Sequence, residues 1–163
     1  MKGYVQVYTG NGKGKTTAAF GLALRAAGAG LRVYIAQFVK GMTYSELEPL
    51  ARFSDLITIE QYGRDCFITS KLTEQDIQAA QQGLTQVHEI VTCGLCDVLI
   101  LDEATIATQF GLFTVDELLD LINAKPESME IVITGRLADA RLMARADLVT
   151  EMREVKHYYA AGV

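Results

Sequence analysis

Two patterns of apolar residues alternate along the chain. Short runs rich in β-branched and aromatic residues recur six times, and they alternate with longer stretches of helical period. Because this alternation is typical of a parallel sheet covered by helices, it predicts an α/β fold. The predicted strands are Tyr4–Tyr8, Leu31–Gln37, Leu56–Glu60, Val98–Leu101, Glu130–Thr134 and Asp147–Met152.

Two of the predicted helices carry start signals. Thr73 with Asp76, and Thr114 with Glu117, have the spacing of a capping box, in which the first hydroxyl and the later carboxylate bond to each other's backbone amides. Both helices should then lay an apolar face on the sheet. The residues expected on those faces are Ile77, Ala80, Leu84, Val87 and Val91 in the first helix, and Leu118, Leu119 and Ile122 in the second.

The chain shows no sign of a division into domains. It has two prolines, no Pro/Gly/Ser-rich stretch and no internal repeat, so residues 1–163 are expected to form one domain. No apolar run approaches the roughly 18 residues that span a bilayer. The three cysteines, an odd number, do not make a disulfide framework, and no leader is recognisable. A cytoplasmic location is therefore expected.

Charge is unevenly distributed. The whole sequence has 15 basic and 20 acidic residues and a net charge of −5. The first 45 residues hold six basic side chains and no acidic one, whereas the remainder holds nine basic and 20 acidic side chains. Since nucleic acids and anionic membranes need a dominant positive field, the net acidity argues against both as partners, and the acid-free start predicts a local anion site.

The strongest chemical signal is TGNGKGKTT at Thr9–Thr17, between the first strand and a helix rich in Ala and Leu. Its glycines let backbone N–H groups converge on phosphate oxygens, while Lys15 and Thr16 supply a cation and a metal-ligand hydroxyl. Compared with the phosphate-loop pattern G-x-x-x-x-G-K-[ST], the first glycine comes one place late, at Gly10, so the loop is one residue short. A flexible Gly/Lys turn is the alternative.

Two further motifs follow apolar strands. Asp102 and Glu103 end the sequence DVLILDE, where a phosphate-loop protein holds magnesium, although an apolar strand followed by two acids is a weak signal alone. Arg136 ends TGR and could meet a phosphate on the same sheet edge, or anchor a loop through an ordinary salt bridge.

Other features are weaker. The Cys93–Cys96 pair has the spacing of half a zinc or redox site, but it is better explained by a helix end at Gly94, because the second half is missing. His157, in KHYY, is a candidate for function, although surface packing is the more common reason for such a cluster.

Together these motifs resemble one family, the P-loop type of corrinoid adenosyltransferase. The resemblance runs in order across essentially the whole chain. It rests on GNGKGKTTAAFG at 10–21, QFVKG at 37–41, VLILDE at 98–103, ITGR at 133–136 and EMREVKHYYAAGV at 151–163. It implies a P-loop NTPase-like (RecA-like), mostly parallel sheet of about six strands with helices on both faces, in a homodimer.

The activity implied by the resemblance is transfer of the 5'-deoxyadenosyl group of ATP to the cobalt(I) of a reduced corrinoid, with release of triphosphate. Matched position by position, Lys15 and Glu103 are the catalytic candidates, Thr16 and Glu103 bind Mg²⁺, and Asp102 is a further metal ligand or accepts a hydrogen bond from one of the metal ligands. The expected ATP-binding residues are Gly10, Asn11, Gly12, Lys13, Gly14, Lys15, Thr16, Thr17 and Arg136.

The corrinoid side of the resemblance is less complete. The family uses apolar side chains to remove the lower axial ligand of cobalt, and Phe67, then Tyr62, are the candidates here, with core packing as the alternative for Phe67. Relatives usually extend further at both ends, so the corrinoid is expected to be covered by the dimer partner, by another element or incompletely. A reductase or flavoprotein is a possible electron donor. The competing functions are a phosphotransferase or ATPase that moves the γ-phosphoryl group, and a non-catalytic nucleotide-binding subunit.

Overall fold

A central sheet of six strands organises the molecule. The computed structural model describes residues 1–163 except 1, 42–44, 46, 64–71, 159–161 and 163. The strands are β1 (Val5–Thr9), β2 (Val33–Phe38), β3 (Ile57–Tyr62), β4 (Val98–Asp102), β5 (Glu130–Thr134) and β6 (Leu148–Glu151). They lie in the order β3-β2-β4-β5-β1-β6 and every neighbouring pair is parallel. All six predicted strands are thus confirmed, with ends that differ by at most two residues.

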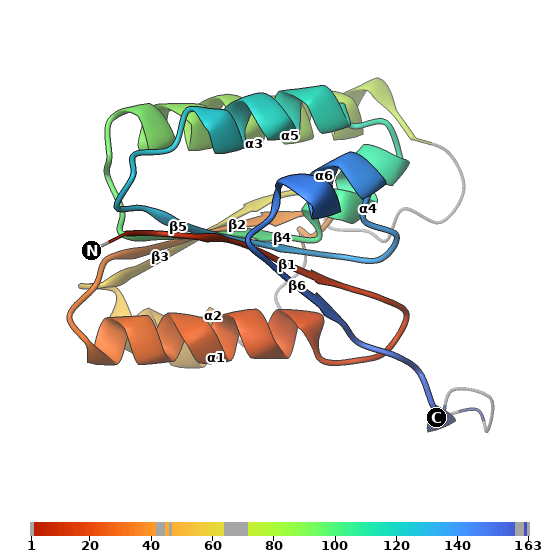
Figure 1. Ribbon diagram of the computed structural model, residues 1–163, viewed down its shortest axis with the longest axis horizontal. Helices are drawn as coiled ribbons and strands as arrows, with labels where there is room; N and C mark the ends of the chain where they lie inside the picture. The colour runs from red at the N-terminus through yellow and green to blue at the C-terminus, as the bar shows by residue number, and fades with distance from the viewer. Residues whose placement is uncertain (1, 42–44, 46, 64–71, 159–161, 163) are drawn as a thin grey trace.

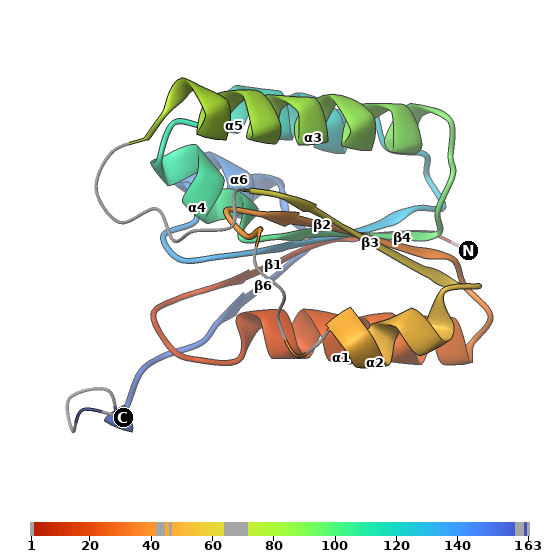
Figure 2. The same cartoon turned by 180° about the vertical axis from the view of Figure 1, so that it is seen from behind.

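Helices cover both faces of this sheet (Figures 1 and 2). On one face lie α1 (Lys15–Gly28) and the short α2 (Leu47–Leu50), followed by a 3₁₀ turn at Ala51–Phe53. On the other face lie α3 (Glu74–Thr92), α4 (Ala104–Gln109), α5 (Val115–Asn123) and α6 (Ala140–Arg145). The predicted α/β fold with a parallel sheet is confirmed. In the described part of the chain, no helix is long and apolar enough to cross a membrane.

The two predicted capping boxes are present. Thr73 and Asp76 begin α3, and Thr114 and Glu117 begin α5, each with both reciprocal hydrogen bonds. The predicted apolar faces need one correction: Ile77 is 39% exposed, because it lies in the first turn of α3 at the margin of the buried stripe. In α5 the sequence pattern missed Leu121, which is buried beside Leu118 and Ile122.

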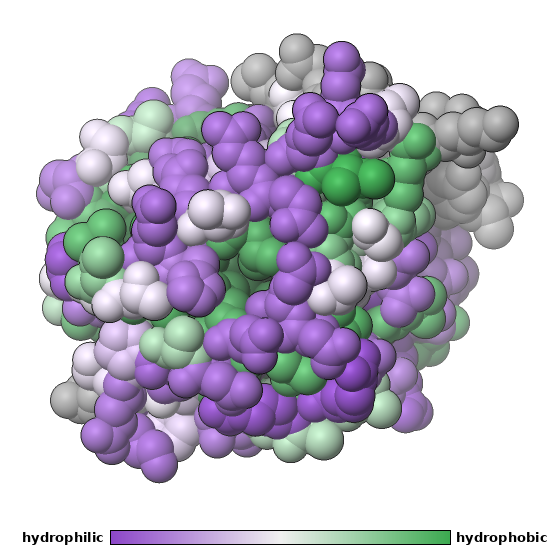
Figure 3. Space-filling model, turned by 90° about the horizontal axis from the view of Figure 1, so that it is seen from above, coloured by the Kyte–Doolittle hydropathy of each residue, from purple (hydrophilic) through white to green (hydrophobic). Residues whose placement is uncertain are grey.

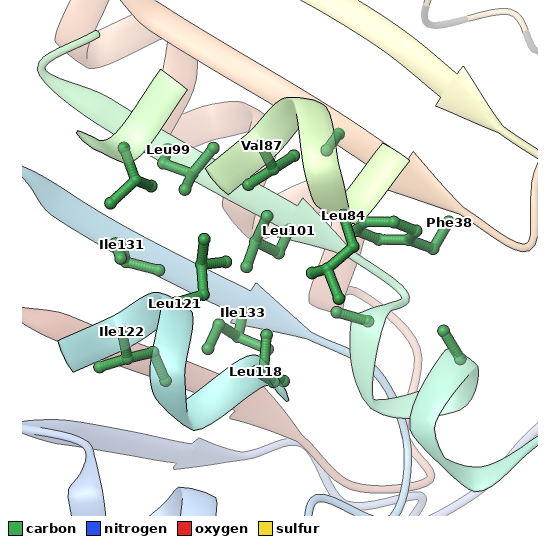
Figure 4. Packing of buried hydrophobic residues seen from close by; sticks show 14 of the residues in the cluster. Phe38, Leu84, Val87, Leu99, Leu101, Leu118, Leu121, Ile122, Ile131 and Ile133 are labelled. Atoms are coloured by element: carbon green, nitrogen blue, oxygen red, sulfur yellow. The ribbon is translucent and has the colours of Figure 1, made fainter. Parts of the chain in front are cut away.

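Each face of the sheet has its own hydrophobic core. Figure 4 shows the larger one, in which Leu84 and Val87 of α3 and Leu118 and Leu121 of α5 pack onto β4 and β5. The smaller core joins α1 to the opposite face through small side chains such as Ala19 and Ala23. Figure 3 looks down on the layer that holds α3 and α5, whose outer surface is largely hydrophilic. Since β4 and β5 are covered on both sides, the uninterrupted apolar runs VLIL of β4 and IVI of β5 are explained.

Candidate active site

The glycine-rich loop joins β1 to α1 and packs against the chain that leaves β6. Gly10 has φ +98° and Gly14, the residue that caps α1, has φ +116°. The Gly12 N–H donates to the carbonyl oxygen of Met152 over 2.7 Å, and a Cβ on Gly12 would lie 2.7 Å from that same oxygen. Because side chains would clash here or force a left-handed backbone into strain, glycine is required at these positions.

A cavity of 290 Å³ opens over this loop. It lies at the carboxyl ends of the strands, where α/β sheets bind ligands. Its lining residues are Asn11, Gly12, Lys13, Gly14, Lys15, Thr16, Thr17, Glu103, Arg136 and His157. The structure therefore brings together nearly all the site residues expected from the sequence. Gly10 lines a neighbouring cavity of 450 Å³ instead, and Phe67 lies outside the described residues.

Lys15 is held inside the loop that it follows. Its side chain is buried, and its ammonium donates to the carbonyl oxygens of Gly10 at 2.8 Å and Gly12 at 2.7 Å. Burial lowers the pKa of this ammonium from its usual value, and the nearby Glu103 opposes that shift. The loop thus surrounds a cation that lines the cavity, and this cation could bind an anion there.

Asp102 is a fully buried carboxylate at the end of β4. Its Oδ1 accepts from the hydroxyls of Thr16 at 2.8 Å and Thr134 at 2.7 Å. Its Oδ2 accepts from the Gln37 amide at 3.0 Å and the Lys40 ammonium at 2.8 Å. Asp102 is thus the acceptor that orients Thr16.

Glu103 lies at the turn between β4 and α4 and lines the cavity. It has φ +58° and caps α4, and its N–H donates to the Thr134 hydroxyl over 3.0 Å. Burial, then the charge of Asp102, raises the pKa of its carboxyl above the usual value, while Lys40, Lys15 and Arg136 counteract this. A carboxylate in a left-handed turn, lining a cavity beside a hydroxyl, is a fit oxygen donor for a hard cation.

Lys40 reaches Asp102 from an unusual stretch of backbone. Val39 has φ +62°, a region that costs a non-glycine residue about 1–2 kcal/mol. Gly63 lies so close to the backbone of Lys40 that a Cβ on Gly63 would be 2.6 Å from the backbone nitrogen of Lys40. Sequence reasoning gave no role to Gln37, Lys40 or Thr134, although QFVKG and ITGR are motifs of the resemblance. The signal that could have found Gln37 and Thr134 is their position at the ends of buried strands that flank β4.

Arg136 follows β5 and faces the cavity. Its backbone carbonyl accepts from the Thr105 hydroxyl over 2.7 Å, and the preceding Gly135 has φ +140° and would clash with Thr105 if it carried a Cβ. Arg136 forms no salt bridge with a carboxylate of the described residues. The loop is therefore fixed through its backbone, which leaves the guanidinium exposed at the cavity.

The segment after β6 approaches the loop from the side. The Lys13 ammonium donates to the Tyr158 hydroxyl over 2.8 Å, and this bond raises the pKa of Lys13. The rings of His157 and Tyr158 are 4.7 Å apart, and His157 lines the cavity. His157 thus reaches the site that its place after the last strand suggested.

Two other candidates have structural roles. Tyr62 is buried, its hydroxyl lies 2.6 Å from that of Tyr34 and its ring packs in the core, so its expected role as an axial-ligand wedge stays a prediction. The Cys93–Cys96 pair marks the end of α3, as expected, with Gly94 at φ +62°. Burial raises the pKa of Cys96 to about 12, and none of the described residues form a His/Cys/Asp/Glu cluster that could hold a metal.

Comparisons with known proteins agree on one family. The profile of the family described as "ATP:corrinoid adenosyltransferase BtuR/CobO/CobP" matches residues 1–163. A "Corrinoid adenosyltransferase" of Pseudomonas aeruginosa is 33% identical over 99% of this chain and 80% of its own length. Proteins of Escherichia coli, with the same name, and Salmonella typhimurium, "Corrinoid adenosyltransferase CobA", are 33% and 34% identical over 99% of this chain and 82% of their lengths.

Proposed function

The chain belongs to the ATP:corrinoid adenosyltransferase family, and we propose that it carries out the family's reaction in the cavity over the glycine-rich loop. In that reaction the 5'-deoxyadenosyl group of ATP passes to the cobalt(I) of a reduced corrinoid and triphosphate leaves, a step of cobalamin synthesis. The observation that carries the proposal is the convergence of Lys15, Thr16, Glu103 and Arg136 around one cavity.

The proposed work of the protein is alignment and charge stabilisation. The corrinoid cobalt(I) is a strong nucleophile and displaces triphosphate from saturated carbon in line, so little acid or base catalysis is needed. Negative charge gathers on the departing triphosphate. The loop N–H groups, the Lys15 ammonium and the Arg136 guanidinium stabilise that charge, and the rigid loop holds the ribose carbon in line with cobalt.

The residues present fit a magnesium ion. The cavity offers the Thr16 hydroxyl and the Glu103 carboxylate, which are hard oxygen donors, and one or two protein ligands suffice where phosphates and water complete the shell. Thr16 donates its hydroxyl hydrogen to Asp102, so its lone pairs remain available for a cation. When bound, the ion would neutralise charge on the triphosphate. Thr16 and Glu103 would hold it, and Asp102 would keep Thr16 oriented.

The remaining parts of the proposal concern the corrinoid and the assembly. We propose that residues 1–163 act as one domain in the cytoplasm, as a homodimer, and that a reductase or flavoprotein supplies electrons. The short loop supports a triphosphate held differently from that of hydrolases, with the ribose carbon exposed. Phe67 remains the proposed wedge that removes the lower axial ligand of cobalt.

Product analysis tests the proposed function. The protein is incubated with ATP, Mg²⁺ and chemically reduced cobalamin, and the phosphate products are separated by ion chromatography. Triphosphate in equal amount to an adenosylated corrinoid supports the proposal. ADP with phosphate, formed whether or not the corrinoid is present, would instead identify transfer of the γ-phosphoryl group.

A further inference from the structure

Lys40 lies outside the glycine-rich loop but is joined to it through one carboxylate. Its ammonium contacts Asp102 Oδ2 at 2.8 Å, and the side chains of Lys40 and Asp102 are 15% and 0% exposed. Asp102 in turn accepts from Thr16, the second residue of α1. A series of contacts therefore links Lys40, just after β2, through Asp102 of β4 to Thr16 at the start of α1.

The backbone around Lys40 is shaped to make this contact. Val39, a β-branched residue, takes the left-handed φ of +62° immediately before it. Such a backbone persists only where the surrounding structure determines it, and it clusters at functional sites. Gly63, which follows β3, lacks the Cβ that would lie 2.6 Å from the backbone nitrogen of Lys40. Two independent features of the chain thus bring the ammonium to Asp102.

The hydrogen bonds of Asp102 define what Lys40 does. Both carboxylate oxygens already accept two donors each: Thr16 and Thr134 on Oδ1, Gln37 and Lys40 on Oδ2. Lys40 is the one cation among these four donors. Without it, a buried negative charge would lie beside the place proposed for a triphosphate, and a like charge in a poorly solvated site repels strongly.

We infer that Lys40 is a positioning residue of the triphosphate site. Its ammonium cancels the charge of Asp102, so that this carboxylate fixes the Thr16 hydroxyl without repelling the triphosphate and without taking a metal itself. Glu103 is then the carboxylate that faces the metal. The inference rests on the proposed placing of triphosphate and Mg²⁺ at the loop.

Binding of ATP measured by calorimetry, with Mg²⁺ and with EDTA, separates this role from a purely structural one. Lys40→Met should weaken ATP binding in EDTA by at least about tenfold, because two unit charges of like sign within about 12 Å repel by that much or more at an effective dielectric constant near 20. The loss should be smaller with Mg²⁺, because the uncompensated Asp102 carboxylate repels the triphosphate but attracts the Mg²⁺ that binds with it. A simple loss of fold would weaken both equally.

Three further variants make the test specific. Lys40→Arg keeps the charge and should bind ATP within about threefold of the original protein. The double variant Lys40→Met with Asp102→Asn removes both charges, keeps an acceptor for Thr16 and should restore most of the lost affinity; it also covers the case in which the single variant does not fold. Lys2→Met, an exposed lysine at the other end of β1, is the matched control.

The possible results are distinct. Binding of ATP by Lys40→Met that equals that of Lys2→Met in EDTA would overturn the inference. So would a double variant that stays as weak as Lys40→Met, because the lysine would then act on the anion directly. Lys15→Ala tests the underlying proposal: undiminished ATP binding would overturn the placing of triphosphate at the loop, whatever Lys40 does.

Discussion

Lys15 shows how one residue combines folding and function in this loop. Its ammonium donates hydrogen bonds to the carbonyl oxygens of Gly10 and Gly12. The charge that would bind a triphosphate therefore also holds the loop in its folded shape. The sequence predicted the position and charge of Lys15 from the GKT pattern. It did not predict the two carbonyl contacts, because these depend on the positive φ of Gly10 and Gly14.

Lys15→Ala should lower turnover of ATP and reduced corrinoid by at least about a hundredfold, the loss expected when a fixed electrostatic contact to developing charge is removed. Thermal unfolding should show an intact fold, because the remaining contacts of the loop are made by its backbone. Activity within a few fold of the original protein would place the triphosphate elsewhere.

Gly10 lies where the glycine-rich loop packs against the chain that follows β6. Gly10→Ala must accommodate both a left-handed backbone and a Cβ that clashes with the Met152 carbonyl, and it should reduce ATP affinity and stability together. Gly30→Ala is the matched control: it has φ +77° but open space around a Cβ, so it should cost only about 1 kcal/mol of unfolding free energy and leave ATP binding unchanged. Equal effects in calorimetry and urea unfolding would contradict this account.

At the scale of elements, local signals predicted the starts of the two capped helices more closely than the bounds of the strands. Thr73 and Thr114 start α3 and α5 as expected, since capping depends on residues three positions apart. The ends of β1 and β3 each extend further than the apolar pattern, because pairing with neighbouring strands continues through the polar residues Thr9 and Gln61. Such pairing is a tertiary contact that no local pattern contains.

The cap of α5 gives a pH-dependent prediction. The N–H of Thr114 donates to Glu117, and this bond lowers the pKa of the Glu117 carboxyl. A lowered folded-state pKa stabilises the fold above the unfolded-state value of about 4.3 and ceases to do so as the pH falls through the folded-state pKa. Glu117→Gln should therefore lose about 0.5 kcal/mol at pH 7. Urea midpoints should converge with those of the original protein in acid, and a constant gap would contradict the assignment.

Asp120→Asn is the control for that experiment. Asp120 lies on the same helix but outside its first turn, so the substitution should leave the urea midpoint nearly unchanged at pH 7.

Tyr62 belongs to the packing of β3 on α3. Its ring lies against Gly83, and its hydroxyl bonds to Tyr34 and Glu60. Tyr62→Phe should lower stability by about 1 kcal/mol, the net worth of a buried hydrogen bond, and leave corrinoid turnover unchanged. Selective loss of turnover, with the melting temperature unaltered, would return Tyr62 to the corrinoid site.

At the scale of the whole molecule, the sheet order places the site. Because β1 lies beside β5, and β4 lies beyond β5, the glycine-rich loop, Arg136 and Glu103 meet at one edge although they are far apart in sequence. The sequence predicted the members of this group by assuming that strand ends converge. It could not predict that Lys40 joins them, because that depends on β2 lying next to β4 and on the backbone of Val39.

The same arrangement separates stability from chemistry. The larger core lies between the sheet and α3 with α5, whereas the cavity lies at the carboxyl ends of the strands. Leu99→Ala, in the centre of β4, should therefore cost about 2–5 kcal/mol of unfolding free energy, yet leave the affinity of the folded protein for ATP unchanged. A calorimetric affinity that falls in step with stability would show that the two are coupled.

The fate of the ribose 5'-carbon tests the central claim most directly. ATP labelled with ¹³C at that carbon is incubated with the protein, Mg²⁺ and cobalt(I) cobalamin, and the products are followed by ¹³C NMR. The account predicts that the labelled carbon becomes bonded to cobalt as triphosphate appears, and that Lys15→Ala gives neither product. A label that remains in ADP or AMP, with its phosphate ester intact, would contradict it.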